Sequence, residues 1–405
     1  MQRGRFGAVA LACVLCACSS SSSSPAIPHC CDGSTATPDA SHAVDSGASA
    51  HDATVSHDAA ASRDAAVAHD AGGSHDAAIV QPDATTPVAD ADADACTVCG
   101  RDWTKYPAIA DVSGATELWV VSDIHGDYGA CTKLLAAGHV IASVPSTPSA
   151  VQWGAGSATF VVVGDMIDKG PDAPDVVTLL SALQVSAAAA GGRVIVTMGN
   201  HEAEFLADPE NSKATGADGL DPQLAALGLS PDATAAGSDA IGAFIKNLPF
   251  AARVDDWFFV HAGDTNGATF SALQTSLQSG VDSMGFGAPV LADAGSLLEA
   301  RLNSSSPQWW DATGNATTLL TSWTSALGVK HLVMGHQPGA VGITNGPNRA
   351  KDQMAAEYGG LLFLIDTGLS VDVDDTGGAL LHVTNVGTST EAWAQVLPDG
   401  STKSL

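Results

Sequence analysis

Five short motifs between residues 122 and 337 contain side chains that can bind metal ions. In chain order they are SDIHGD (122–127), GDMIDKGP (164–171), GNHE (199–202), VHAG (260–263) and MGHQ (334–337). Carboxylates, an amide oxygen and imidazoles together suit Mn, Fe or Zn, whereas a Mg or Ca site would use fewer histidines. We interpret the motifs as the ligands of a two-metal site.

The apolar run before each motif is expected to be a buried strand. These runs are rich in β-branched and aromatic residues, and they read ELWVV, TFVVV, RVIVTM, WFFV and HLVM. Open α/β sheets gather ligands and catalytic groups where strands end. Five strand ends should therefore converge. Asp123 and His125, two residues apart, would point to the same side if the strand geometry continues through them.

Helical stretches are expected between these strands, and strands dominate after His336. The helices are predicted near 128–137, 174–190, 240–247, 269–278 and 317–327. An α/β first half followed by a β-rich end favours two packed sheets flanked by helices. The segment 210–238, rich in Gly, Asp and Ala, is interpreted either as a cap that sets substrate choice or as a variable surface loop.

The beginning of the chain predicts export. Residues 1–18 contain two arginines, then an apolar stretch too short to span a bilayer comfortably, and end at small residues. The residues before Cys18 have the spacing of a bacterial lipobox, so Cys18 is predicted to carry a lipid anchor. That resemblance and Ser19 point to the outer membrane, on its periplasmic or its surface side. An ordinary secretory signal is the alternative.

Residues 19–98 are predicted to be a disordered tether, followed by a folded domain at 99–405. The tether has almost no large apolar residue and carries twelve acidic residues against Arg63, so it should stay extended. His-Asp-Ala recurs in it, and we interpret these repeats as a solvated spacer rather than a metal scavenger. The formal net charge of the whole chain is −28, which argues against nucleic acid as a partner.

The cysteines fit an exported chain. Cys96 and Cys99 form a C-x-x-C that is interpreted as a disulfide at the start of the domain, with half of a zinc site as the alternative. Cys131 is expected to be a buried small hydrophobe. His139, His331 and His382 have no motif around them and are interpreted as structural histidines.

Together, the five motifs and their order resemble the calcineurin-like metallophosphoesterase superfamily, which includes Ser/Thr protein phosphatases, Shewanella-like phosphatases and diadenosine tetraphosphate hydrolases. The resemblance spans roughly 117–396. It implies a four-layer α-β-β-α sandwich with two metal ions (Mn, Fe or Zn) at strand ends between the sheets. It also implies the ligands: Asp123, His125 and Asp165 for one ion, and Asp165, Asn200, His261 and His336 for the other.

The resemblance further implies a mechanism. A hydroxide bridging the two ions would attack phosphorus, while His201, paired with Asp168, would protonate the leaving oxygen. Lys169 stands where protein phosphatases carry Arg in GDxxDRG, and it offers a point charge instead of a fork. Arg301 is either a second phosphate contact or an exposed surface residue. The pair Trp309 and Trp310 is interpreted as packing rather than as a wall of the cleft.

The sequence therefore predicts a lipid-anchored, monomeric phosphatase that hydrolyses phosphate monoesters, phosphoproteins among them. Two alternatives stay open. One is a nucleotide or diadenosine polyphosphate hydrolase, or a phosphodiesterase, acting at the same site. The other is a noncatalytic metal-binding surface lipoprotein, and the intact His201 and Asp168 argue against it.

Overall fold

A computed structural model describes residues 100–301, 308–311, 314–339 and 349–405. The predicted signal peptide with Cys18, the tether, and Cys96 with Cys99 lie outside the described residues.

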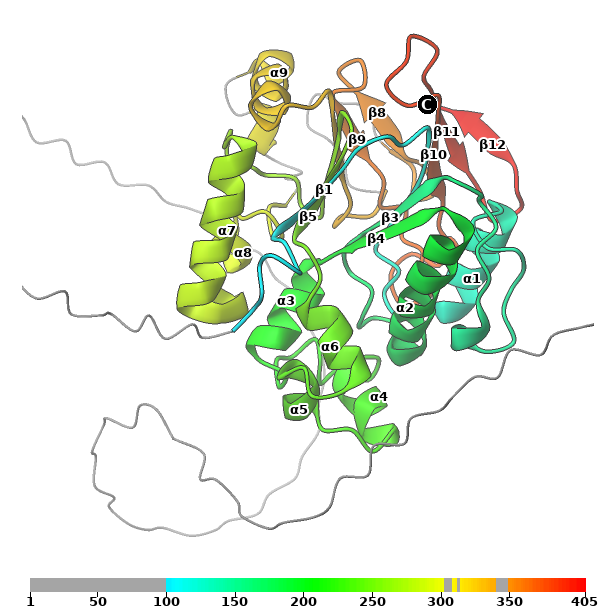
Figure 1. Ribbon diagram of the computed structural model, residues 1–405, viewed down its shortest axis with the longest axis vertical. Coiled ribbons are helices and arrows are strands. Elements are labelled where there is room, and N and C mark those ends of the chain that lie inside the picture. The colour runs from blue at the N-terminus through cyan, green and yellow to red at the C-terminus, as the bar shows by residue number, and fades with distance from the viewer. Residues whose placement is uncertain (1–99, 302–307, 312–313, 340–348) are drawn as a thin grey trace, which may run out of the picture. The chain divides into compact units, whose positions relative to one another are not determined.

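Two six-stranded mixed sheets form the centre of the domain (Figure 1). The first sheet has the order β1 (Ile109–Val112), β5 (Ala251–Val254), β6 (Trp257–Val260), β7 (His331–Met334), β9 (Leu362–Leu364) and β8 (Ala355–Glu357). The second has the order β12 (Thr402–Ser404), β11 (Ala392–Val396), β10 (Leu380–Thr384), β2 (Glu117–Ser122), β3 (Thr159–Val163) and β4 (Arg193–Thr197). Strands β2, β3 and β4 are mutually parallel, as are β6, β7 and β9. Their carboxyl ends consequently line one edge of each sheet.

The two sheets pack face to face because their central strands carry apolar side chains on both faces. In β2, Leu118 and Val120 belong to the cluster between the sheets, whereas Trp119 and Val121 belong to the cluster beneath the helices. This two-residue alternation lets one strand contribute to two cores.

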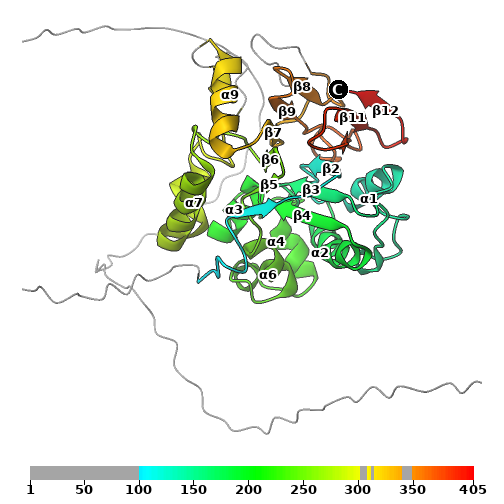
Figure 2. The same ribbon diagram turned by 45° about the horizontal axis from the view of Figure 1, so that its top comes forward.

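Helices cover the outer face of each sheet (Figures 1 and 2). Helices α1 (Tyr128–Ala137) and α2 (Ala173–Ala190) lie on the second sheet, and α7 (Phe270–Met284) and α9 (Ala316–Leu327) lie on the first. The predicted four-layer α-β-β-α sandwich is confirmed. Helix α2 is long and apolar enough to cross a membrane, but it packs Val176, Leu180 and Leu183 into the core, as the central helix of a globular domain does.

One expectation about a helix needs correction. Helix α7 continues to Met284 rather than ending near 278, because Leu273, Leu277 and Val281 repeat every four residues and keep one buried stripe going. The segment 210–238 is a folded insertion, with helices α4 (Leu220–Ala226) and α5 (Pro231–Ala235). The remaining short helices are α3 (Asn200–Ala207), α6 (Ala240–Lys246) and α8 (Pro289–Ala292), with 3-10 turns η1 (Pro148–Ala150), η2 (Gly285–Gly287) and η3 (Trp309–Asp311).

Arg101 fixes the start of the described domain. Its buried guanidinium donates to the backbone carbonyls of Tyr106 and Pro107 and to three carbonyls at the end of α6, those of Lys246, Asn247 and Leu248. The planar group also lies 4.7 Å from the centre of the Trp103 ring.

Replacing Phe160 tests the core beneath the helices. Phe160 in β3 is fully buried, so Phe160→Ala should lower the free energy of unfolding by about 3–5 kcal/mol through lost burial and a cavity. The matched control is Val185→Ala, at a side chain that is 71% exposed on α2, which should change it by less than about 0.5 kcal/mol. Urea unfolding measures both, and similar losses in the two variants would contradict the assigned packing.

Candidate metal centre

The structure brings Asp165, Asn200, His261 and His336 together in the domain's interior. The Nε2 atom of His261 lies 3.2 Å from Asp165 Oδ1, 3.1 Å from Asn200 Oδ1 and 3.0 Å from His336 Nδ1. All four residues are buried. They follow the carboxyl ends of β3, β4, β6 and β7, as the convergence of strand ends predicted.

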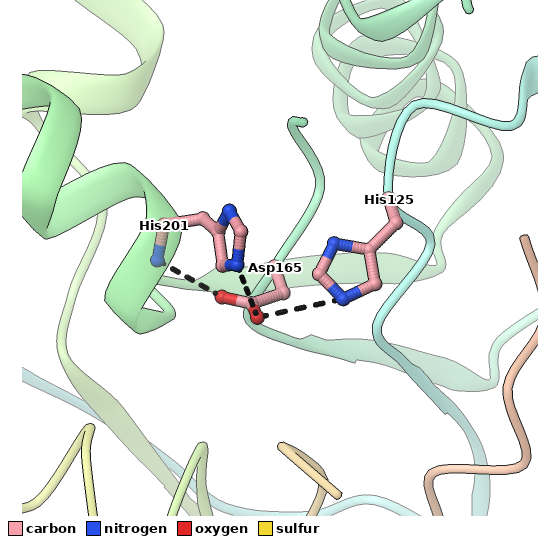
Figure 3. Close-up of side chains that lie close together, drawn as sticks. All are labelled: His125, Asp165 and His201. Atoms are coloured by element: carbon pink, nitrogen blue, oxygen red, sulfur yellow. Dashed lines mark hydrogen bonds and ion pairs between the residues drawn. The ribbon is translucent and has the colours of Figure 1, made fainter. Parts of the chain in front are cut away.

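The other predicted ligand set lies on the opposite side of the Asp165 carboxylate. His125 Nε2 is 3.6 Å from Asp165 Oδ2 and 3.9 Å from Asp123 Oδ1. Figure 3 shows His125 and His201 turned toward Asp165 from two different segments of the chain. Asp165 is thus the only one of these carboxylates that reaches both groups of histidines among the described residues.

The orientation of the histidine rings suits metal binding. The Nδ1 atoms of His125 and His261 face the carbonyls of Ile167 and Val163 at 3.2 and 3.1 Å. A carbonyl can only accept, so Nδ1 carries a hydrogen, and Nε2, on the side of the carboxylates, is the nitrogen that can bind an ion once it is deprotonated. His336 Nε2 is buried without a hydrogen-bond partner. Imidazoles, carboxylates and an amide oxygen in this arrangement fit the two transition-metal ions that the sequence predicts.

The pKa values of the buried groups in the site depend strongly on the charges of their neighbours. Burial alone would lower the pKa of His261, but the Asp165 carboxylate outweighs it and the pKa is raised to about 10. Burial would raise the pKa of Asp165, but His261 and His201 hold it well below its usual range. Burial and then the charge of Asp366 raise the pKa of Asp123. Positive charge at the centre is therefore required for both carboxylates to be ionised.

The backbone reaches the site through left-handed turns. Twelve described non-glycine residues have positive φ, and half of them are predicted site residues. These six are Asp123, His125, Asp165, Asp168, Lys169 and His336. The idea that Asp123 and His125 converge because strand geometry continues is wrong: β2 ends at Ser122 and both residues have φ near +50°. Such strained conformations cost energy and persist where packing enforces them.

Two glycines allow this close packing. A Cβ on Gly199 would lie 2.1 Å from Asp165 Oδ1, and one on Gly335 would lie 2.3 Å from Asp123 Oδ2. Any side chain at these positions would displace a carboxylate from the site.

His201 and Asp168 form the predicted pair. His201 Nδ1 lies 2.8 Å from Asp168 Oδ2, and His201 Nε2 lies 3.9 Å from Asp165 Oδ2. The other Asp168 oxygen accepts a hydrogen bond from Leu220 N, the first residue of α4, at 2.8 Å. In addition, Gln223 on the same helix donates to Gly170 O. The folded insertion at 210–238 thus supports the Asp168 loop.

Both predicted phosphate contacts, Lys169 and Arg301, are exposed. Lys169 is exposed, with Nζ 3.5 Å from His125 Nε2. The Arg301 side chain is 56% exposed and lies 3.6 Å from Glu299. Its charge nevertheless helps to lower the pKa of His336, although burial is the main cause. The aromatic pair packs as expected, since Trp310 is fully buried and Trp309 stacks on Trp323 with ring centres 5.2 Å apart.

Two buried acids escaped the sequence analysis. Glu202 accepts hydrogen bonds from the backbone N–H groups of Asp165, Met166, Ile167 and Gly199, which ties the GDMID loop to the GNHE turn. Its place within GNHE was the available signal. Asp366 follows β9, and its charge acts on Asp123; burial raises its own pKa to about 6.

The structure also shows the surroundings of Cys131 and of the three histidines outside the motifs. Cys131 is buried, which raises the pKa of its thiol to about 12 and confirms an inert residue. His139 is exposed. His382 pairs with Glu117, and His331 lies beside two carboxylates. His331 is buried and bonded to the Gly360 carbonyl, as a structural histidine is, and its carboxylate neighbours are distant along the chain.

Comparisons with known proteins agree with this geometry. Residues 116–351 match the family described as calcineurin-like phosphoesterase. A stretch of 98 residues is 36% identical to an uncharacterized protein of Schizosaccharomyces pombe and covers 24% of this chain. It spans about a quarter (26%) of that protein.

Solved structures with a similar fold include a cold-active protein tyrosine phosphatase of a psychrophilic Shewanella species. It has 19% identity and a TM-score of 0.53, over 74% of this chain and 83% of that one. A second structure, described as a cold-active protein tyrosine phosphatase, has 18% identity and a TM-score of 0.54, over 74% and 82% of the two chains. At these identities the likeness establishes the fold.

Glu202 should be required for metal binding although it is not itself a predicted metal ligand. Glu202→Gln keeps one acceptor and turns an NH₂ toward N–H donors, so it should cost about 1–3 kcal/mol of stability and weaken metal binding about 10–100-fold. Thermal unfolding and zinc titration measure these effects. Glu210→Gln, at an exposed position, is the control. Unchanged zinc affinity in Glu202→Gln would show that the loop keeps its shape without this acid.

Metal binding should release protons. With a pKa of about 10 in the metal-free site, His261 holds a proton at pH 7 and must lose it to bind an ion. We expect Zn²⁺ binding at pH 7 to release at least about one proton per chain and to weaken as pH falls. Calorimetry in two buffers with different ionisation enthalpies measures the number. A binding heat that is the same in both buffers would contradict this assignment.

Proposed function

The chain belongs to the calcineurin-like phosphoesterase family, and from this premise we propose that this metal-dependent phosphoesterase hydrolyses phosphate monoesters, with His201 as the general acid. One observation carries the proposal. A buried histidine, held by a buried carboxylate at 2.8 Å, stands beside the carboxylate that both groups of predicted ligands share. A site used only to bind metal has no need of this pair.

The predicted ligands divide around Asp165. Asp123 and His125 would hold one ion with it, and Asn200, His261 and His336 would hold the other. Bound ions supply Lewis acidity to a phosphate ester and to water. The chain's own part is to present these donors in fixed orientations, which the carbonyls behind His125 and His261 and the four N–H groups around Glu202 achieve.

His201 acts through the nitrogen that faces the centre. Asp168 accepts the hydrogen bond from Nδ1, which fixes the orientation of the ring. The proton on Nε2 then passes to the oxygen of the departing alcohol or phenol. Leu220 N holds the second Asp168 oxygen and so keeps the carboxylate in place during the transfer.

Lys169 is proposed to bind the phosphate oxygens at the mouth of the site. Its ammonium group is exposed and lies near His125, and as a point charge it accepts varied phosphate geometries. Arg301 is proposed as a second contact once its weak pairing with Glu299 is exchanged for phosphate. Because enzymes described as protein tyrosine phosphatases share the fold, phosphotyrosine is a substrate to test.

We also propose that the protein is exported and works as a monomer, attached through lipid at Cys18 to the outer membrane. The support is the lipobox-like spacing and the acidic tether that follows it. This placement favours phosphate esters or phosphoproteins outside the cytoplasm as substrates.

Hydrolysis of para-nitrophenyl phosphate tests the proposed reaction. The full chain is stripped of metal, titrated with Mn, Zn, Fe and Mg, and compared on the bis-ester analogue and a phosphotyrosine peptide. We expect metal-dependent monoester turnover that Asp165→Asn abolishes. His201→Gln should lower kcat by about 10²–10⁴-fold while keeping the metal.

His382→Gln is the control, at a histidine paired with Glu117 on another strand. Faster turnover of the bis-ester than of the monoester would instead assign a phosphodiesterase. No turnover with any metal, although two ions bind at the Asp165 centre, would overturn the proposal in favour of a noncatalytic metal-binding protein.

A further inference from the structure

A third group of metal-competent side chains lies at the opposite ends of the strands that lead to the catalytic centre. Asp256 directly precedes β6, His331 opens β7, and Glu391 directly precedes β11. Because β6 and β7 are parallel, with Trp257 opposite His331, these residues lie at the strands' amino ends. The predicted ligands His261 and His336 follow the carboxyl ends of the same two strands.

The donor atoms of the three side chains lie close enough to share one ion. One atom from each residue lies within 4.8 Å of the others, and His331 Nε2 is 3.2 Å from Glu391 Oε1. Ligands of tetrahedral zinc at about 2.0–2.2 Å from the ion are separated by about 3.3 Å. The side chains of His331 and Glu391 are each only 10% exposed.

The His331 ring is fixed with one nitrogen facing the carboxylates. Nδ1 donates to the carbonyl of Gly360 at 2.7 Å, and the ring stacks on Trp257 with centres 4.2 Å apart. Nε2 is the remaining nitrogen and faces Glu391. A backbone carbonyl behind a histidine is the usual support for a metal ligand.

The two carboxylates are also positioned, and one oxygen of Asp256 has no hydrogen-bond partner. Glu391 accepts from the indole N–H of Trp393 at 3.0 Å and from Gly387 N at 2.7 Å. Asp256 pairs through Oδ2 with the exposed Lys330 at 2.7 Å, while its Oδ1 is buried without a hydrogen-bond partner. An ion pair between a protonated His331 and Glu391 would leave that oxygen unsatisfied, which is costly.

We propose that Asp256, His331 and Glu391 bind a structural divalent metal ion, for which Zn²⁺ is the best match. One imidazole and two carboxylates leave a fourth tetrahedral position for water. Asp256 and His331 belong to the first sheet and Glu391 to the second, so the ion joins the two sheets. This site is independent of the phosphatase reaction.

His382 provides a matched comparison within the same chain. Its Nε2 lies 2.7 Å from Glu117 Oε1, and its ring stacks on Trp119 with centres 3.7 Å apart. Like His331, it therefore stacks on a tryptophan and pairs with a glutamate. Within the described residues, however, it belongs to no group of three metal-competent side chains.

Zinc content of the full chain tests the proposal. The protein is stripped of metal, reconstituted with Zn²⁺, freed of unbound ion and analysed by elemental mass spectrometry. We expect His331→Gln and Glu391→Gln each to lose about one zinc per chain, and His382→Gln to lose none. The zinc-dependent rise in Tm should also shrink in the first two variants only. Equal zinc content in all four proteins would overturn the proposal.

Anomalous diffraction from the unmodified protein at the zinc edge decides the matter if the His331 variant does not fold. A peak between Asp256, His331 and Glu391 supports the site. Peaks at the Asp165 centre alone overturn it in favour of a His331–Glu391 ion pair. Because neither experiment measures turnover, failure here leaves the proposed phosphatase reaction untouched, and failure of the phosphatase assay leaves this site untouched.

Discussion

The arrangement of the catalytic centre depends on a single buried carboxylate. Asp165 stands within reach of His125, His201 and His261, and its ionised form is stable only because positive charge surrounds it. The surrounding backbone is shaped to this requirement. Gly199 leaves room for the carboxylate, and the backbone N–H of His201 donates to it. The neighbouring segments adopt strained turns so that their side chains reach the same point.

The sequence predicted the parts of this site that have a local signature. Apolar runs followed by ligands identified the strand ends, and the distribution of helices and strands predicted two packed sheets. The interactions that it missed are formed by residues distant along the chain or by the backbone itself. Glu202 stands within the GNHE motif, but the motif does not show that its oxygens accept four backbone hydrogen bonds. Likewise, His331 and Glu391 lie at the starts of strands in different sheets and are brought together where the two sheets pack on each other.

Strands β6 and β7 give the domain a rigid connection between its two ends. Each is four residues long, with buried side chains throughout, and each leads into a predicted ligand of the catalytic centre. A strand of this length spans about 13 Å, and its register cannot slip without turning buried side chains to the wrong face. Contacts at the amino ends therefore fix the positions of His261 and His336.

Through a series of contacts, Arg101 links the beginning of the domain to the Asp168 carboxylate. Its guanidinium joins the first described segment to the end of α6, and α6 packs on α5, within the insertion that also supplies Leu220 N to Asp168. The autonomous unit consequently begins ahead of the first strand. A truncated chain that started at β1 would expose the carbonyls at the end of α6. It would also loosen, through the insertion, Asp168, which holds the proposed general acid His201.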